Sequence, residues 1–160
     1  MAADELKIST GEHKNRIAKI QNTLRKNSIE ALYLTNSTRI LYSTGFAHIS
    51  TERPLAAVIP NEKPPFFMAP HLEYDHIREE CPLADEVLTY PDYPGKIHPM
   101  RVFAKFLAQK ALASSRIATD SAEGAAGGYG YRGPSLQDLM GRAKFIDGRD
   151  IVDKIGRAHV

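Results

Sequence analysis

The sequence has no tryptophan and a single cysteine among its 160 residues. One cysteine cannot close an internal disulfide, and it has no second thiolate for the paired spacing of a cysteine-based zinc site. We therefore interpret Cys81, in "EECPLAD", as a partly buried small side chain near the end of a helix rather than as a nucleophile. The chain also lacks an apolar run approaching the roughly 18 residues that a membrane span needs, so no membrane-crossing segment is predicted.

Neither sign of charge is in large excess. The 21 lysines and arginines are scattered among 19 acidic residues, which leaves a net charge of +2 and no basic stripe with interleaved aromatic residues. A nucleic-acid partner is therefore not expected. The N-terminal "MAADELKIST" carries acidic residues and lacks the basic start and apolar core of a secretory signal, which predicts a cytoplasmic protein.

The length suits one domain with a core of its own, and apolar and turn-forming residues divide the chain into alternating helices and strands. The patterns predict strands at 29–35, 54–60, 64–70, 85–90, 116–120 and 144–148. They predict helices at 9–27, 38–44, 71–80, 100–113, 135–143 and 149–155. The strands at 54–60 and 64–70 are separated by "NEK" and should form an antiparallel hairpin. The predicted fold class is therefore α/β, with a mixed β-sheet flanked by helices on its faces.

The sequence also predicts how one helix begins and which side chains of two other helices pack in the core. Ser9 and Glu12 are spaced as a capping box for the first helix. In the helix at 71–80 the expected core contacts are Leu72 and Ile77. In the helix at 100–113 one apolar face is expected to consist of Phe103, Phe106, Leu107 and Ala111.

The densest cluster of ligand-type side chains is "HLEYDH", with His71, Glu73, Asp75 and His76. His71 and Asp75 have the i, i+4 spacing of helical metal ligands, but two ligands make half a site at most, which favours a solvated helix face. The glycine-rich "SAEGAAGGYGYRG" lacks the lysine ending of a phosphate-binding loop and is interpreted as a flexible connection. No catalytic residue and no metal ligand is predicted in this chain.

The loop "FAHISTER", residues 46–53, is the best candidate for a binding surface. It follows Gly45, which is predicted to end the helix at 38–44 in a left-handed conformation. Phe46 offers an aromatic ring, His48 an imidazole that titrates near neutrality, and Arg53 a guanidinium suited to carboxylates. The alternative is that Arg53 pairs with Glu52 or a neighbouring carboxylate and that Phe46 fills the core.

The order of these segments resembles the N-terminal domain of the creatinase/prolidase group, which includes Xaa-Pro dipeptidases and aminopeptidase P. The resemblance is carried by "RIAKIQNTLRKNSIEALYLTNSTRILYSTGF", which begins at Arg16, then by "ERPLAAVIPNEKPPFFMAP" and by "DIVDKI". Within the first segment, Tyr42, Thr44, Gly45 and Phe46 match the Tyr-x-Thr-Gly-Phe signature of that group. The resemblance extends over essentially the whole chain.

The resemblance implies a non-catalytic domain at 1–155, with 156–160 ("GRAHV") as a tail or a truncated junction. In the group, a separate catalytic domain supplies two Asp, one His and two Glu to a pair of divalent metal ions, such as manganese, cobalt or zinc. No residue of this chain matches those ligands, so the chain alone is expected to be inactive. The resemblance also implies a homodimer, in which Phe46, His48 and Arg53 would restrict access to an active site.

Two alternatives stay open at this point. The chain could be a free-standing module that binds a ligand or a protein, or it could belong to a creatinase-like hydrolase of a non-peptide C–N bond. A downstream segment with five metal ligands in the same reading frame would favour a two-domain enzyme, although it would not identify the substrate.

Overall fold

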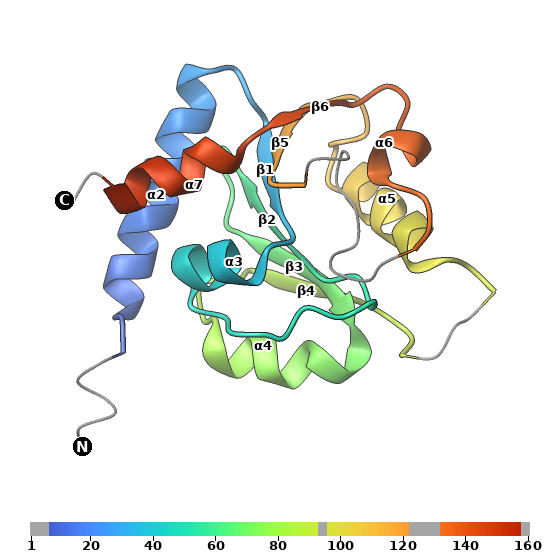
Figure 1. Cartoon of the computed structure of the whole chain (residues 1–160), viewed down its shortest axis with the longest axis horizontal. Helices are drawn as coiled ribbons and strands as arrows, with labels where there is room; N and C mark the ends of the chain where they lie inside the picture. The colour runs from blue at the N-terminus through green and yellow to red at the C-terminus, as the bar shows by residue number, and fades with distance from the viewer. Residues whose placement is uncertain (1–6, 93–95, 122–131, 158–160) are drawn as a thin grey trace.

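The computed structural model describes residues 7–92, 96–121 and 132–157, and these form the predicted mixed sheet with helices on its faces (Figure 1). Six strands lie in the order β4-β3-β2-β1-β5-β6. They are β1 (Ala31–Leu34), β2 (Ala56–Pro60), β3 (Phe66–Pro70), β4 (Glu86–Tyr90), β5 (Arg116–Thr119) and β6 (Lys144–Asp147). β2 is antiparallel to both of its neighbours, and the other pairs are parallel.

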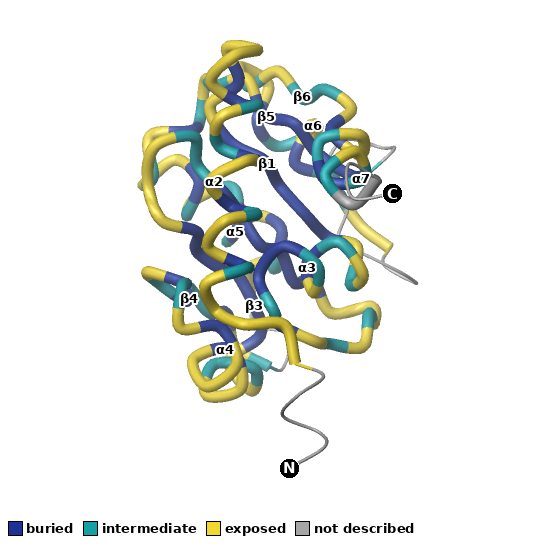
Figure 2. Tube along the Cα trace, turned by 90° about the vertical axis from the view of Figure 1, so that its left-hand side faces the viewer, coloured by how far each residue is buried: buried dark blue, intermediate teal, exposed yellow. Residues whose placement is uncertain are grey.

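Helices cover both faces of the sheet, and the sheet separates two clusters of buried side chains (Figures 1 and 2). The helices are α2 (Thr10–Lys26), α3 (Ser37–Thr44), α4 (Tyr74–Glu80) after a 3-10 turn at His71–Glu73, α5 (Pro99–Gln109), α6 (Leu136–Leu139) and α7 (Arg149–Arg157). The first cluster packs under α2, α3, α4 and α7, and the second under α5 and α6. Within the described residues, no helix has the length and apolar character needed to cross a membrane.

The alternation of side chains along β1 explains why both faces need a cover. Leu32 and Leu34 belong to the first cluster, whereas Ala31 and Tyr33 belong to the second. Successive side chains of a strand point to opposite faces, so an all-apolar strand has two faces to bury. The central strands are accordingly buried along most of their length, as Figure 2 shows.

Local signals in the sequence set the ends of the helices. The Ser9 hydroxyl accepts a hydrogen bond from the Glu12 N–H at 3.1 Å, which confirms the predicted start of α2. The Asn36 side chain accepts from the Arg39 N–H at 3.1 Å and begins α3. Gly45 ends α3 with φ of 85°, the left-handed conformation predicted for it.

Three expectations for the helices were wrong in part. Leu72 is 53% exposed because the segment at 71–73 is a 3-10 turn rather than the first turn of an α-helix, whereas Ile77 is fully buried. Ala111 is exposed with φ of 61°, since the helix α5 ends at Gln109 and the chain turns there. The helix predicted at 135–143 is one turn, Leu136–Leu139, and the residues after it lead directly into β6.

The carboxyl ends of β1, β3, β4, β5 and β6 meet at one edge of the sheet. At this edge Asp120, which follows β5, accepts hydrogen bonds from the Thr35 N–H, the Thr35 hydroxyl and the Asn36 N–H at 2.9, 3.1 and 2.9 Å. Arg39 on α3 forms a two-pronged ion pair with Asp153 on α7, at 2.9 and 3.0 Å. These bonds hold the loops at the edge in place.

Candidate functional site

A pocket of about 280 Å³ opens at the carboxyl edge of the sheet. Its walls come from Thr35 after β1, from Pro70 at the end of β3 with Leu72 and Glu73 after it, and from residues 48–53 of the loop with Leu55. Because β2 runs against its neighbours, the loop that leads into β2 lies beside the ends of β1 and β3. Ligands of open α/β sheets are generally bound outside the carboxyl ends of the strands, so this is the expected place for a binding site.

Loop 46–53 is attached to the domain near both of its ends. At its start the Ala47 N–H donates to Glu80 Oε2 on α4 at 3.2 Å. Just after its end the Tyr90 hydroxyl of β4 donates to the Pro54 carbonyl at 2.8 Å. Between these points the loop is exposed or half-buried, and residues 48–53 form one wall of the pocket. The two hydrogen bonds hold this wall against the rest of the domain.

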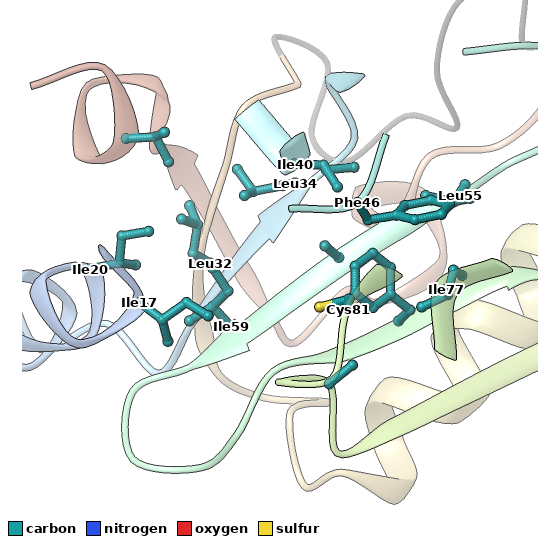
Figure 3. Packing of buried hydrophobic residues seen from close by; sticks show 14 of the residues in the cluster. Ile17, Ile20, Leu32, Leu34, Ile40, Phe46, Leu55, Ile59, Ile77 and Cys81 are labelled. Atoms are coloured by element: carbon teal, nitrogen blue, oxygen red, sulfur yellow. The ribbon is translucent and has the colours of Figure 1, made fainter. Parts of the chain in front are cut away.

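Phe46 lies in the core, as the alternative reading of the sequence proposed. Its side chain is fully buried and packs edge-on against Phe67, with ring centroids 5.5 Å apart. Figure 3 shows Phe46 beside Leu55, in the same cluster as Ile77. Phe46 therefore supports the loop from beneath.

His48 lies on the pocket wall and stacks on Phe46, with ring centroids 5.6 Å apart and an interplanar angle of 7°. Burial lowers the pKa of His48, so its imidazole is neutral at pH 7. The Nδ1 atom is buried without a hydrogen-bond partner in the described part of the chain. A buried ring nitrogen without a partner is unfavourable by itself, which makes it a candidate contact for a bound group.

Arg53 is exposed on the same wall. Its backbone N–H donates to Thr51 Oγ1 at 3.2 Å, but no carboxylate of the described residues pairs with its guanidinium. The alternative pairing with Glu52 is therefore not found there. Beside it Ile49 is 88% exposed and Leu72 is 53% exposed. The pocket thus combines an available cation with apolar side chains that face solvent.

The acidic and histidine side chains of "HLEYDH" do not make the His71–Asp75 pair that their i, i+4 spacing allowed. His71 Nδ1 lies 3.2 Å from Thr89 Oγ1 and does not meet Asp75. His76 instead lies between Glu73 and Glu80, an i, i+3, i+7 set that the sequence reasoning missed although its spacing was visible. Among residues 7–92, 96–121 and 132–157, no group of three or more His, Cys, Asp or Glu side chains is placed to hold a metal ion.

Cys81 directly follows the last residue of α4, near the end of a helix as predicted, and it is fully rather than partly buried. Burial raises the pKa of its thiol, which keeps the sulfur protonated and poorly nucleophilic. Figure 3 shows its sulfur in the core among apolar side chains. This residue is part of the packing of the first cluster.

These features define the class of protein: it is an α/β domain with a mixed sheet, in which loop 46–53 lines a pocket at the carboxyl edge and leads into the antiparallel strand β2. Residues 16–155 match the family model of the creatinase/prolidase N-terminal domain. The chain belongs to this family, as its resemblance in sequence predicted. No curated protein matches the sequence of the chain.

Solved structures share the fold. The N-terminal domain of an Xaa-Pro dipeptidase from Lactobacillus brevis has a TM-score of 0.64 and 23% identity, with 90% of this chain and 98% of that chain covered. A prolidase from Thermococcus sibiricus has a TM-score of 0.70 and 19% identity, with 89% of this chain and 36% of that chain covered. Dipeptidase PepE from Mycobacterium ulcerans has a TM-score of 0.71 and 19% identity, with 93% of this chain and 38% of that chain covered. The chain thus spans a whole isolated domain but little more than a third of these two longer chains.

Proposed function

We propose that the chain is the non-catalytic N-terminal domain of a metal-dependent Xaa-Pro dipeptidase or aminopeptidase, where it contributes to a homodimer and restricts access to the active site. The family match over residues 16–155 carries the proposal, and solved structures that bear the names of such enzymes support it. A cytoplasmic location is part of the same proposal. Two divalent metal ions, manganese, cobalt or zinc, belong in this proposal to a catalytic domain, because the described residues of this chain do not offer a set of ligands.

Loop 46–53 is the part of the chain that restricts access in this proposal. Phe46 holds the loop from the core, while His48 and Arg53 present a neutral imidazole and a cation on the pocket wall. A guanidinium can bind a peptide carboxylate through two parallel hydrogen bonds, which fixes both the charge and the direction of a short substrate. The exposed Ile49 and Leu72 favour burial of this wall against another surface.

The experiment is Arg53→Ala in a polypeptide that carries both this domain and a catalytic domain. We expect kcat/KM for Xaa-Pro dipeptides to fall about tenfold or more if the contact is desolvated, with the melting temperature and metal content nearly unchanged. Arg101→Ala is the matched control, because Arg101 is an exposed arginine of α5 on the other face of the sheet. A lowered melting temperature with unchanged kinetics would contradict the role of Arg53.

One observation favours a second function, that of a free-standing binding module. The pocket is formed by this chain alone, and its wall includes His48, whose buried Nδ1 has no hydrogen-bond partner among the described residues. Such a module would bind a small carboxylate without any catalytic domain. Titration of the 160-residue chain with short peptides, followed at the His48 resonances, distinguishes the two: saturable binding favours the module, and its absence favours a wall that needs a second surface. The third possibility, hydrolysis of a non-peptide C–N bond, concerns the catalytic domain.

A further inference from the structure

The imidazole of His76 lies between two carboxylates. Its Nδ1 is 3.0 Å from Glu73 Oε2, and its Nε2 is 3.0 Å from Glu80 Oε1. An ionised carboxylate can only accept a hydrogen bond, so each of these contacts needs an N–H on the ring. A neutral imidazole has one N–H, whereas the imidazolium has two. Both contacts are therefore satisfied together only when His76 is protonated.

Glu80 connects this histidine to the pocket loop. While Glu80 Oε1 receives the hydrogen bond from His76, Glu80 Oε2 accepts from the Ala47 N–H at 3.2 Å. The ring of Phe46 also contacts His76 edge-on, with centroids 5.0 Å apart. The start of loop 46–53 thus rests on a side chain whose position depends on the charge of His76.

Loss of the proton from His76 places a nitrogen lone pair against one of the two carboxylates. The contact then becomes repulsive, and either Glu73 or Glu80 has to move away. When Glu80 moves, the Ala47 N–H loses its acceptor and the loop loses its first attachment. The side chain of His76 is 45% exposed, so its ring exchanges protons directly with solvent.

The charged groups around His76 favour the protonated form. The hydrogen bond to Glu73 has the largest effect and raises the pKa of His76. Desolvation lowers this pKa, and the hydrogen bond to Glu80 and the charges of both carboxylates raise it further. From the loop, His48 also faces this group, but burial lowers its own pKa, so its imidazole is neutral at pH 7. Protonated His76 therefore stabilises the fold fully below its unfolded pKa of about 6.5, and this contribution is lost as pH rises through the raised value.

We propose that His76, Glu73 and Glu80 form a proton-operated latch that holds the start of loop 46–53 when His76 is charged and releases it when His76 is neutral. The latch regulates the wall that the proposed function uses. It is nevertheless defined by contacts inside this chain, so its test needs neither a catalytic domain nor a substrate.

The test is an NMR titration of the 160-residue chain from pH 5 to pH 9, which follows the His76 ring and the Ala47 amide. We expect the Ala47 amide proton to shift upfield as pH rises, with the same midpoint as the His76 ring and above the ordinary histidine value. His71→Gln is the matched control, because His71 contacts Thr89 rather than a carboxylate. In this variant the Ala47 titration should be unchanged.

Two further variants separate the latch from a general effect of pH. In His76→Gln the Ala47 inflection should disappear. In Glu80→Gln the midpoints of His76 and Ala47 should both move to lower pH. An Ala47 inflection that persists in His76→Gln, or an Ala47 resonance that does not titrate in the wild type, overturns the latch. Because this test measures no activity, its result does not depend on whether Arg53 contributes to kcat/KM. The Arg53 experiment likewise does not depend on the latch.

Discussion

Replacement of Gly45 by alanine should lower the free energy of unfolding for two reasons: its backbone conformation is unfavourable for alanine, and the added methyl group would clash with a buried ring. Gly45 has φ of 85°, and an added Cβ would lie 2.9 Å from Nε2 and 3.1 Å from Cδ2 of His13. His13 is buried in α2, so its ring has little room to move. Gly141 offers the matched control, since nothing lies within 4 Å of its added Cβ.

The magnitude for Gly45→Ala has two contributions. A left-handed conformation is unfavourable for alanine by about 1–2 kcal/mol. Insertion of a methyl group against a buried ring adds about 1–3 kcal/mol. The free energy of unfolding should therefore fall by about 2–5 kcal/mol, which corresponds to a loss of about 4–20 °C in melting temperature for a domain of this size. Gly141→Ala should stay within about 0.5 kcal/mol of the wild type.

Chemical denaturation of Gly45→Ala, His13→Ala and the double variant measures the two contributions separately. His13→Ala removes the ring, so the double variant should be more stable than the sum of the single changes predicts, by about 1–3 kcal/mol. The backbone contribution should remain. If Gly45→Ala is as stable as Gly141→Ala, or if the two changes are strictly additive, the assigned conformation and contact are wrong.

Two further predictions concern packing and buried polar contacts. Gly148→Ala should lower the free energy of unfolding by about 1–3 kcal/mol in denaturant titrations, because its Cβ would lie 2.7 Å from Ala118 Cβ and 3.1 Å from Thr119 N; wild-type stability would contradict this. Asp120→Asn should cost about 1–3 kcal/mol, because an amide NH2 would replace one of the oxygens that accept from Thr35 and Asn36. An unchanged melting curve for Asp120→Asn would show that these bonds contribute little.

The sequence predicted the elements whose signals are local. The strand β1 and the cap at Ser9 depend on neighbouring residues, and the structure has both as predicted. The left-handed Gly45 is local in the same sense. By contrast, Leu72 was wrongly assigned to the core, since the 3-10 turn before α4 rotates its side chain to solvent.

The candidate site was predictable as a loop but not as a set of contacts. The position of loop 46–53 followed from Gly45 and the apolar run after it. Its attachments join residues distant in sequence: Ala47 to Glu80, and Pro54 to Tyr90. Such contacts depend on which strands become neighbours, and the burial of Phe46 depends on them too. No periodicity within the loop encodes them.

The central claim is that this chain is a non-catalytic domain of a two-domain peptidase. The most direct measurement is the hydrolysis of an Xaa-Pro dipeptide, with excess manganese, cobalt or zinc, by the 160-residue chain and by the polypeptide of its complete reading frame. Two-metal hydrolysis needs several converging carboxylates around the ions, so the account predicts turnover by the complete polypeptide only. Turnover by the 160-residue chain that survives repurification and stops with a chelator would contradict it.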